Sequence, residues 1–509
     1  MKKATSRRQF IQSSALLGGA GLLSSCASID QYFRSDSSLM MDRVVIVGAG
    51  LAGLHAAYQL KKRRIPFCVF EASQTYGGRI KTLYHYNQDD QYVDVGGKSI
   101  EGTHQDVFSL CKELGVKIRE LGDYSQKSDQ LVFIDGKPVE LKSVLQELVP
   151  FFRKVSQLRN QFFEIDEASP SLFKKVDGLQ NYDRISFEDL LTELQRQMSP
   201  EIKRALMQSM TSAFGIDASE LSALQFLYQF NEHGSQMPFQ RGQSYGVDGG
   251  SSALTQKLFE RSNSIVKNHA FKFSHRLTSI GRRGLDFLLN FKTQDGDSSF
   301  MTRNVIFALP SNQLKTIIGW RDFGVNDELR AVIENVALSE SKQVLFKSNS
   351  RFWERKYPSL FEGKVFGDFP FQKGESLTAS QSGNSSIYTF QVGGKEARQK
   401  DFKQMRKAEN FLQQVFQLTL KEKIEFSNVV SWGETPFIQG YQTVYQPGSF
   451  FQSSDVWRNS KTKGIYFAGE HVHPKWIGTM QGAILSSQQA IQKILNQGDF
   501  KAIAPDIKS

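Results

Sequence analysis

The chain has 509 residues, of which 39% are hydrophobic and 12% aromatic, so it is long enough for two domains with separate cores. Its formal net charge is +11, but Lys2, Lys3, Arg7 and Arg8 supply four of these charges within one short N-terminal stretch. The sequence carries no basic stripe interleaved with aromatic residues, which excludes nucleic acid as an expected partner.

The first 26 residues have the features of an export signal. Arg7 and Arg8 precede an apolar stretch at residues 15–23, which is too short for a stable membrane anchor, and Cys26 follows. The paired arginines resemble a Tat-type signal, and the residues ending at Cys26 resemble a bacterial lipobox. We therefore expect export to the periplasm and membrane attachment through lipidated Cys26, with residues 27–41 as a polar tether. An ordinary secretory signal with a chance cysteine is the alternative.

A dinucleotide-binding unit follows the tether. A β-branched run at residues 44–47 predicts a buried strand, and Gly48, Gly50 and Gly53 continue it in G-x-G-x-x-G spacing. These glycines allow a tight turn, a close backbone approach to a pyrophosphate and close packing of helix on strand. Glu71 ends the next strand, where its carboxylate can accept hydrogen bonds from a ribose. The predicted cofactor-binding set also includes Leu51, Ala52 and Ala72.

The next turn distinguishes between dinucleotides. Gly77, Gly78 and Arg79 would give the pyrophosphate a second contact, which NAD enzymes do not usually carry. With this turn the segment resembles the flavin-containing amine oxidase family, which includes monoamine, polyamine and L-amino acid oxidases. The resemblance implies FAD as the cofactor. It also implies noncovalent binding, because Tyr441 stands near the cysteine that bonds FAD in monoamine oxidases and no cysteine follows Cys111.

A second glycine turn leads to a candidate substrate residue. In the family a turn such as Gly96, Gly97 and Lys98 lies against the flavin ring, and Glu101 follows it here. A carboxylate in a partly desolvated cleft attracts a cation, so Glu101 is a candidate for holding the substrate ammonium. A solvent-facing loop carboxylate is the alternative. L-amino acid oxidases place an arginine near Ser99, so an amino acid substrate is disfavoured but stays open, since Lys98 is a cation.

The rest of the chain alternates between two domains. The pattern changes from about residue 114 to residue 239, where residues 139–165 and 186–230 show apolar residues at three- and four-residue spacings and predict a helical insertion. The fold class is α/β, with a doubly wound, Rossmann-like FAD-binding domain and a discontinuous α+β substrate-binding domain. The resemblance implies an FAD-binding domain at 42–113, 243–312 and 426–495, a substrate-binding domain at 114–242 and 313–425, and a tail at 496–509. It also places Leu277 in the cofactor-binding set.

Lys342 is the residue expected to assist the chemistry. It precedes an alternating strand that ends in an F-W pair, as does the family lysine that holds a water beside flavin N5. The spacing to Trp353 is one residue longer than in the family, so a bulge, or Lys347 in this role, is an alternative. Alternation favours Lys342, because Val344 and Phe346 share its face of the strand. A solvated strand lysine is the remaining interpretation.

The last cofactor segment follows a buried strand at residues 465–468. Gly469 and Glu470 resemble the family turn that contacts the FAD pyrophosphate and ribityl chain. A helix begins near Thr479, and in the family its N-terminus stabilises negative charge at the flavin edge. Trp476 would flank the isoalloxazine. The cofactor-binding set is completed on this helix by Met480 and Ala483.

The resemblance implies oxidation of an amine. The α-hydrogen would pass to the flavin, the imine would hydrolyse to an aldehyde and ammonia or a smaller amine, and O₂ or another electron acceptor would reoxidise the cofactor. Two other functions stay open: a FAD-dependent desaturase or isomerase, and an exported electron-transfer protein that binds flavin. No metal site or thiol nucleophile is indicated, because Cys68 and Cys111 lack partners at suitable spacing.

Overall fold

The structure is a computed structural model, and it describes residues 43–121, 131–162, 178–195, 198–230, 244–263, 271–360, 362–369, 371–460 and 462–498. The predicted export signal and tether lie outside the described residues. Within the described ranges, none of the helices has both the length and the apolar character that a membrane crossing requires.

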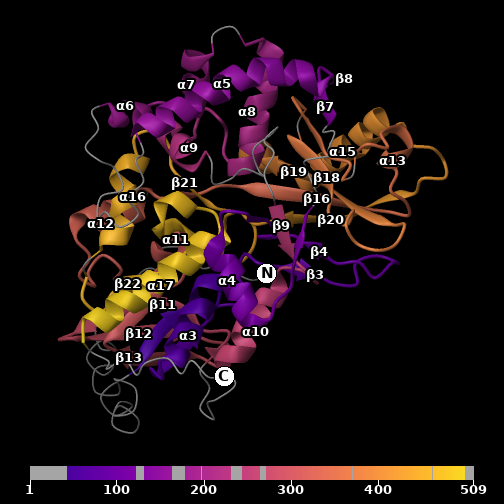
Figure 1. Cartoon of the computed structure of the whole chain (residues 1–509). Coiled ribbons are helices and arrows are strands. Elements are labelled where there is room, and N and C mark those ends of the chain that lie inside the picture. Colours follow the sequence, from indigo (N-terminus) through magenta and orange to yellow (C-terminus); the bar gives the residue numbers. More distant parts are fainter. Residues whose placement is uncertain are drawn as a thin grey trace, which may run out of the picture.

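A five-stranded parallel sheet lies in the lower part of the molecule in Figure 1, where its strand β22 (Ile465–Phe467) is labelled. The central strands are buried on both faces, as is usual for parallel sheets. They come from three separated stretches of the chain. The strand order is β10 (Phe271–Lys272), β2 (Phe67–Phe70), β1 (Val44–Val47), β14 (Asn304–Phe307) and β22 (Ile465–Phe467).

The two faces of this sheet are covered differently. Val44 and Ile46 face the helices α3 (Leu51–Lys62) and α17 (Met480–Asn496), which pack on each other. The alternate residue Val47 faces a three-stranded antiparallel sheet of β11 (Arg276–Arg283), β12 (Asp286–Lys292) and β13 (Asp297–Thr302). The predicted nucleotide-binding α/β unit is therefore present, with a β-sheet in place of helices on its second face.

A seven-stranded sheet forms the second half of the molecule. Helix α15 (Asp401–Phe416) packs on it through Phe411, Leu412 and Val415. The predicted domain boundary at residue 426 is wrong, because it falls inside β20, which pairs with β16 in this sheet. The strand order is β20 (Ile424–Ser431), β16 (Ser341–Ser348), β19 (Ser386–Gly393), β18 (Lys373–Ser376), β17 (Val365–Gly367), β7 (Leu131–Ile134) and β8 (Lys137–Val139).

The predicted helical insertion is present in the described residues, but the same stretch also contains β7 and β8, which belong to the seven-stranded sheet. Its helices lie along the top of Figure 1, and α8 packs on β17 and β19 of the seven-stranded sheet. Ser186 caps α7 with a capping box that it forms with Asp189. The helices are α5 (Leu141–Phe162), α6 (Leu179–Arg184), α7 (Phe187–Leu194), α8 (Pro200–Phe214) and α9 (Ala223–Gln229).

The remaining described elements are small sheets and helices that are distributed over both halves. Small sheets pair β3 with β4, β15 with β21, and β9 with both β5 and β6. The strands are β3 (Thr82–Leu83), β4 (Val93–Asp94), β5 (Ile100–Glu101), β6 (Ile118–Glu120), β9 (Ser244–Val247), β15 (Ala337–Leu338) and β21 (Thr443–Val444). The helices are α4 (Gln105–Leu114), α10 (Ser252–Asn263), α11 (Ser311–Leu314), α12 (Asp327–Asn335), α13 (Trp353–Lys356), α14 (Gly394–Ala397), α16 (Phe450–Asn459), and the 3₁₀ turns η1 (Glu470–Val472) and η2 (Pro474–Trp476).

Candidate active site

A cavity of about 450 Å³ lies between the carboxyl end of the parallel sheet and the seven-stranded sheet. Its wall includes Val47 and Phe70, the last residues of β1 and β2, and Ala308, which follows β14. Ligands of open α/β sheets bind at this end of the strands. The cavity wall contains these residues of the predicted cofactor-binding set: Gly48, Gly50, Leu51, Ala52, Glu71, Ala72, Gly77, Gly78, Arg79, Gly96, Gly97, Lys98, Leu277, Gly469, Glu470, Thr479, Met480 and Ala483.

Glycine allows close backbone approaches beneath the cavity. Gly53 is outside the cavity wall, and a Cβ on it would lie 2.0 Å from the carbonyl oxygen of Gly48. Its role is therefore to bring α3 close to the preceding turn. Gly50 and Gly78 are both in the wall, and a Cβ on Gly78 would lie 3.1 Å from the Cα of Gly50. Two chain segments thus meet here without side chains.

The Glu71 carboxylate is held in place by the backbone. Its Oε2 accepts a hydrogen bond from the Ala49 amide at 2.7 Å, and its Oε1 accepts from the amide and hydroxyl of Ser73, both at 2.8 Å. These bonds orient Glu71 at the end of β2 and in the cavity wall. A ribose-binding role for Glu71 stays a prediction.

Two helices begin at the cavity. Leu51 and Ala52 form the start of α3, and Met480 and Ala483 lie in the first turn of α17. The Thr479 hydroxyl caps α17 by accepting a hydrogen bond from the Gly482 amide at 3.1 Å. Helix N-termini carry partial positive charge, so this wall favours negatively charged groups of a ligand.

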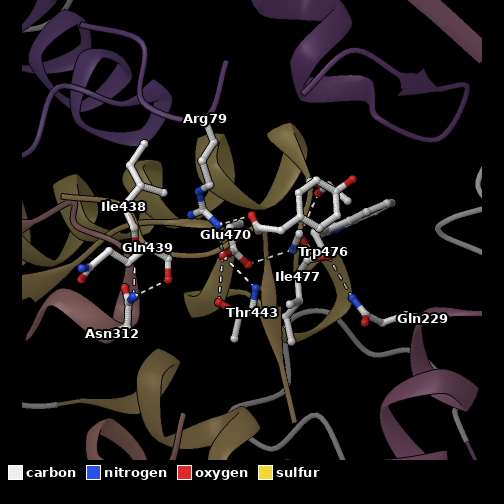
Figure 2. A network of polar contacts seen from close by, with 12 residues as sticks. Arg79, Gln229, Asn312, Ile438, Gln439, Thr443, Glu470, Trp476 and Ile477 are labelled. Carbon is white, nitrogen blue, oxygen red and sulfur yellow. Dashed lines mark hydrogen bonds and ion pairs between the residues drawn. The ribbon is translucent and has the colours of Figure 1, made fainter. Parts of the chain in front are cut away.

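Arg79, which is partly exposed, and the buried Glu470 form an ion pair in the cavity wall (Figure 2). The Nη1 of Arg79 donates to Glu470 Oε1 at 2.8 Å and to the Tyr441 carbonyl at 3.0 Å. Glu470 also accepts hydrogen bonds from the amide and hydroxyl of Thr443 and, at 2.9 Å, from the Gly478 amide. Burial alone would raise the pKa of Glu470, but the charge of Arg79 and the hydrogen bonds that the carboxylate accepts together lower it. Glu470 therefore links three segments of the chain as an ionised carboxylate.

The opposite wall is a row of side chains that crosses the seven-stranded sheet. Strand register pairs Val430 with Gln343, Gln343 with Gln391, Gln391 with Lys373, and Lys373 with Phe366. All five residues line the cavity. This row cannot be predicted from the sequence alone, because only the pairing of strands that are distant in the chain brings its members together.

Lys342 faces away from the cavity, so the predicted role for it at the cofactor is wrong. Its Nζ donates to Asp401 at 2.7 Å, to Glu434 at 3.0 Å and to the Gln399 carbonyl at 3.3 Å. Burial opposes the charge on Lys342, but the hydrogen bonds that it donates to Asp401 and Glu434, together with the charges of these carboxylates, outweigh burial and raise the pKa of Lys342. Successive residues of a strand point to opposite faces, and Gln343 is the one in the cavity wall.

The sequence contained one indication that Gln343 and not Lys342 lines the cavity: the spacing between Lys342 and Trp353 is one residue longer than in the family. The family spacing, counted back from Trp353, ends on Gln343 and not on Lys342. A shift of one residue moves a side chain to the other face of a strand. Val344 and Phe346 do share the face of Lys342, as predicted, but that face packs against α15.

Trp476 lies behind the cavity wall, so the prediction that its ring flanks the flavin is not met. The ring packs edge-on against His104, with centroids 5.2 Å apart, and His104 is the residue in the wall. The Trp476 carbonyl accepts a hydrogen bond from the Thr479 hydroxyl at 2.7 Å. Tyr441 does line the cavity, and burial raises the pKa of its phenol.

Glu101 and Lys98 both line the cavity, as expected from the sequence. Glu101 is buried at the end of β5, and its amide donates to His104 Nδ1 at 3.2 Å. Lys98 Nζ donates to Glu375 at 2.5 Å. Glu375, on β18, was not found from the sequence.

Comparison with known proteins gives consistent matches over most of the chain. A family model described as flavin containing amine oxidoreductase matches residues 51–495. The chain is 23% identical to "Amine oxidase [flavin-containing] A" of Equus caballus, over 89% of this chain and 85% of that protein. It is 24% identical to "Probable flavin-containing monoamine oxidase A" of Dictyostelium discoideum, over 89% of this chain and 98% of that protein.

Solved structures share the fold. Cyclohexylamine oxidase from Brevibacterium oxydans IH-35A superposes with a TM-score of 0.74 at 19% identity, over 91% of this chain and 100% of that chain. Wild-type putrescine oxidase bound to putrescine superposes with a TM-score of 0.72 at 17% identity, over 90% of this chain and 99% of that chain. The predicted fold class is therefore confirmed.

Proposed function

The chain belongs to the family of flavin-containing amine oxidoreductases, and on this premise we propose that the large cavity is its active site, where FAD lies along the glycine turns. The chain is an oxidoreductase with FAD as its cofactor, and its reaction is the oxidation of an amine to an imine, which hydrolyses to an aldehyde and ammonia or a smaller amine. Its substrate is a small-molecule amine.

The cavity wall has the features that FAD requires. Gly50 and Gly78 meet without side chains and leave room for a pyrophosphate. Glu71, fixed by two backbone amides, supplies the acceptor for ribose hydroxyls. The N-termini of α3 and α17 supply partial positive charge for the anionic parts of the cofactor. When bound, FAD supplies the two-electron acceptor for the hydrogen that leaves the amine carbon.

The chain's own residues position the amine and exclude water. Glu101 in the wall attracts the ammonium form of the substrate by its charge. Phe366 and Val430, at the two ends of the cross-strand row, are apolar and keep water from the cavity. Gln343 and Gln391 between them offer hydrogen bonds that fix the orientation of a bound amine.

One observation supports the proposal most strongly. The glycine turns, Glu71 and the start of α17, from three separated segments, share a single cavity with the row from the seven-stranded sheet. A dinucleotide and a small substrate therefore have adjoining walls. A desaturase or isomerase would have the same cofactor-binding wall. Its substrate-binding wall is not expected to carry Glu101 and several other polar groups.

Anaerobic mixing of the FAD-loaded protein with primary amines, polyamines and amino acids tests the proposal. Loss of the visible flavin absorbance with an amine, at a rate that depends on its concentration, is the expected result. Bound flavin without reduction by any amine would contradict it and favour an electron-transfer role. Readmission of air with detection of H₂O₂ tests O₂ as the electron acceptor, which is part of the proposal.

We also propose that the protein is exported by a Tat-type route and anchored in the periplasm through lipidated Cys26. The support is the Arg7 and Arg8 pair, the short apolar stretch and the position of Cys26. Replacement of both arginines by lysine should retain the protein in the cytoplasm. Cys26→Ser should release it from membranes into the soluble periplasmic fraction, and unchanged membrane attachment would contradict the anchor.

A further inference from the structure

Lys373 lies where two cavities meet. The large cavity shares Lys98, Ser99 and Lys373 with a smaller cavity of about 60 Å³. Arg119 and Lys364 are also in the wall of the smaller cavity. The junction of the two cavities is therefore lined by cationic side chains.

The lysines at this junction outnumber the carboxylates that bind them. Glu375 accepts from Lys98 at 2.5 Å and from Lys373 at 2.9 Å, and it lies 3.8 Å from Lys364. Lys364 is also bound by Glu362 at 3.1 Å. In the wall of the smaller cavity the four cationic side chains of Lys98, Arg119, Lys364 and Lys373 are accompanied by three carboxylates, those of Asp94, Glu362 and Glu375. The cationic side chains in this wall therefore outnumber the carboxylates by one.

The protonation states agree with this count. Burial alone would raise the pKa of Glu375, but Lys373, Lys98 and Lys364 together hold it well below its ordinary value, so Glu375 is ionised. Burial lowers the pKa of Lys373 to about 8, against the attraction of Glu375. Lys373 is therefore a cation at neutral pH.

A second observation points to a polar ligand at the same wall. The Ser209 hydroxyl and the Oε1 of Gln343 are buried and have no hydrogen-bond partner among the described residues. Both residues line the large cavity, and Gln343 belongs to the cross-strand row that contains Lys373. Buried polar groups are normally paired, so the Ser209 hydroxyl is expected to donate to an acceptor on a ligand, whereas the Gln343 Oε1 is expected to accept from a donor such as the substrate amine.

We propose that the amine oxidised here carries an anionic group, a carboxylate, at the end remote from the reacting amine, and that Lys373 binds this carboxylate. This inference rests on the proposed function. Ser209 donates a hydrogen bond to the same group, and Glu101 attracts the ammonium end. A diamine is disfavoured, because its second ammonium would meet Lys373 without its hydration shell.

A matched set of substrates tests the charge preference. Pentylamine, 5-aminopentanoate and 1,5-diaminopentane have the same chain length and differ in the charge of the remote end. Butylamine, 4-aminobutyrate and putrescine repeat the comparison one carbon shorter. In anaerobic flavin reduction by the FAD-loaded protein, the aminocarboxylate is expected to have the highest kcat/KM and the diamine the lowest.

Substitutions at Lys373 connect the preference to this residue. In Lys373→Gln the ratio of kcat/KM for 5-aminopentanoate over pentylamine should fall by at least about tenfold, while Lys373→Arg should keep most of it. Lys347→Gln is the matched control, because Lys347 lies on β16 of the same sheet with its Nζ over the Tyr86 ring and is outside the cavity wall. It should leave the ratio unchanged.

A binding measurement complements the kinetics. Pentanoate has no amine, so its binding reports the carboxylate site alone. It should perturb the visible flavin spectrum of the wild-type protein and of Lys373→Arg, with a Kd at least about tenfold weaker in Lys373→Gln. Pentylamine oxidation without any preference for the aminocarboxylate, or with a preference that Lys373→Gln retains, would overturn the inference and leave the proposed function standing. Absence of reduction by any amine would overturn both.

Discussion

Lys342 and Gln343 are adjacent in β16 and face opposite sides of its sheet, so that Asp401 and Glu434 bind the Lys342 ammonium while Gln343 lines the cavity. The two positions therefore predict different consequences of substitution, although they are one residue apart. Lys342 stabilises the sheet, whereas Gln343 lines the wall against which the substrate lies.

Lys342→Met should destabilise the fold without slowing the chemistry. The buried ammonium makes two charge-assisted hydrogen bonds, but both partner carboxylates are largely exposed, so we expect a loss of about 1 to 2 kcal/mol in the free energy of unfolding. Flavin reduction by an amine should stay within about twofold of wild type. Gln343→Leu is the counterpart, with an expected rise in KM. A large loss of reduction rate in Lys342→Met with FAD still bound would contradict this assignment.

Gly50→Val should prevent FAD binding and leave the fold intact. Its side chain would extend toward Gly78, in the gap where the two turns meet. We expect the retained FAD, measured by the ratio of visible to ultraviolet absorbance, to fall by more than about tenfold. Gly281→Val is the control, because a Cβ at Gly281 meets no atom within 4 Å and Gly281 is not part of the cavity wall. Normal FAD content in Gly50→Val would place the pyrophosphate elsewhere.

Arg79→Met should leave the Glu470 carboxylate buried and without its cation. Removal of one partner of a fully buried ion pair costs about 3 to 5 kcal/mol, and we expect a smaller loss here because the Arg79 side chain is 23% exposed. Glu470 also orients Thr443 and Gly478. We expect a lower unfolding midpoint in urea and weaker retention of FAD. Glu470→Gln keeps the hydrogen bonds to the backbone and should be milder. Equal stability of wild type and Arg79→Met would show that the pair is dispensable.

As the pH falls, the protein should lose stability at pH values above the range in which its carboxylates are protonated. Burial lowers the pKa of His55 and of His471 to about 4, whereas an unfolded histidine titrates near 6.5. Between these values the unfolded chain binds more protons, so stability falls as the pH drops, by up to about 1.4 kcal/mol per pH unit for each histidine. Urea unfolding at pH 7, 6 and 5 with excess FAD measures the slope. His55→Gln with His471→Leu should flatten it, and an unchanged slope would contradict the assignment.

The charge preference at Lys373 should be lost at alkaline pH. Burial lowers its pKa to about 8, and the groups facing it are Glu375, Lys98 and Lys364. Above pH 8 the neutral amine of Lys373 no longer attracts a carboxylate. The ratio of kcat/KM for 5-aminopentanoate over pentylamine should therefore fall as the pH rises through 8, since the titration of the substrate amine cancels in the ratio. A ratio that stays constant from pH 7 to 9.5 would exclude Lys373 as its source.

The sequence predicted those parts of the site that depend on local spacing. Gly48, Gly50 and Glu71 lie in the cavity wall because two adjacent strands, one turn and one helix place them there. The sequence did not predict which face of β16 lines the cavity. The alternation of side chains along a strand shows which residues share a face, but only tertiary packing determines which face meets the cavity. Lys373 was missed because it reaches the wall only through strand pairing with β19.

The most direct test of the account is the visible spectrum of the purified full-length protein, before and after an amine is added without oxygen. The account predicts the absorbance bands of noncovalently bound FAD, released on denaturation, and their bleaching by an amine at a rate that rises with amine concentration. A protein that is folded and free of flavin when FAD is supplied in excess, or whose bound flavin no amine bleaches, would contradict it.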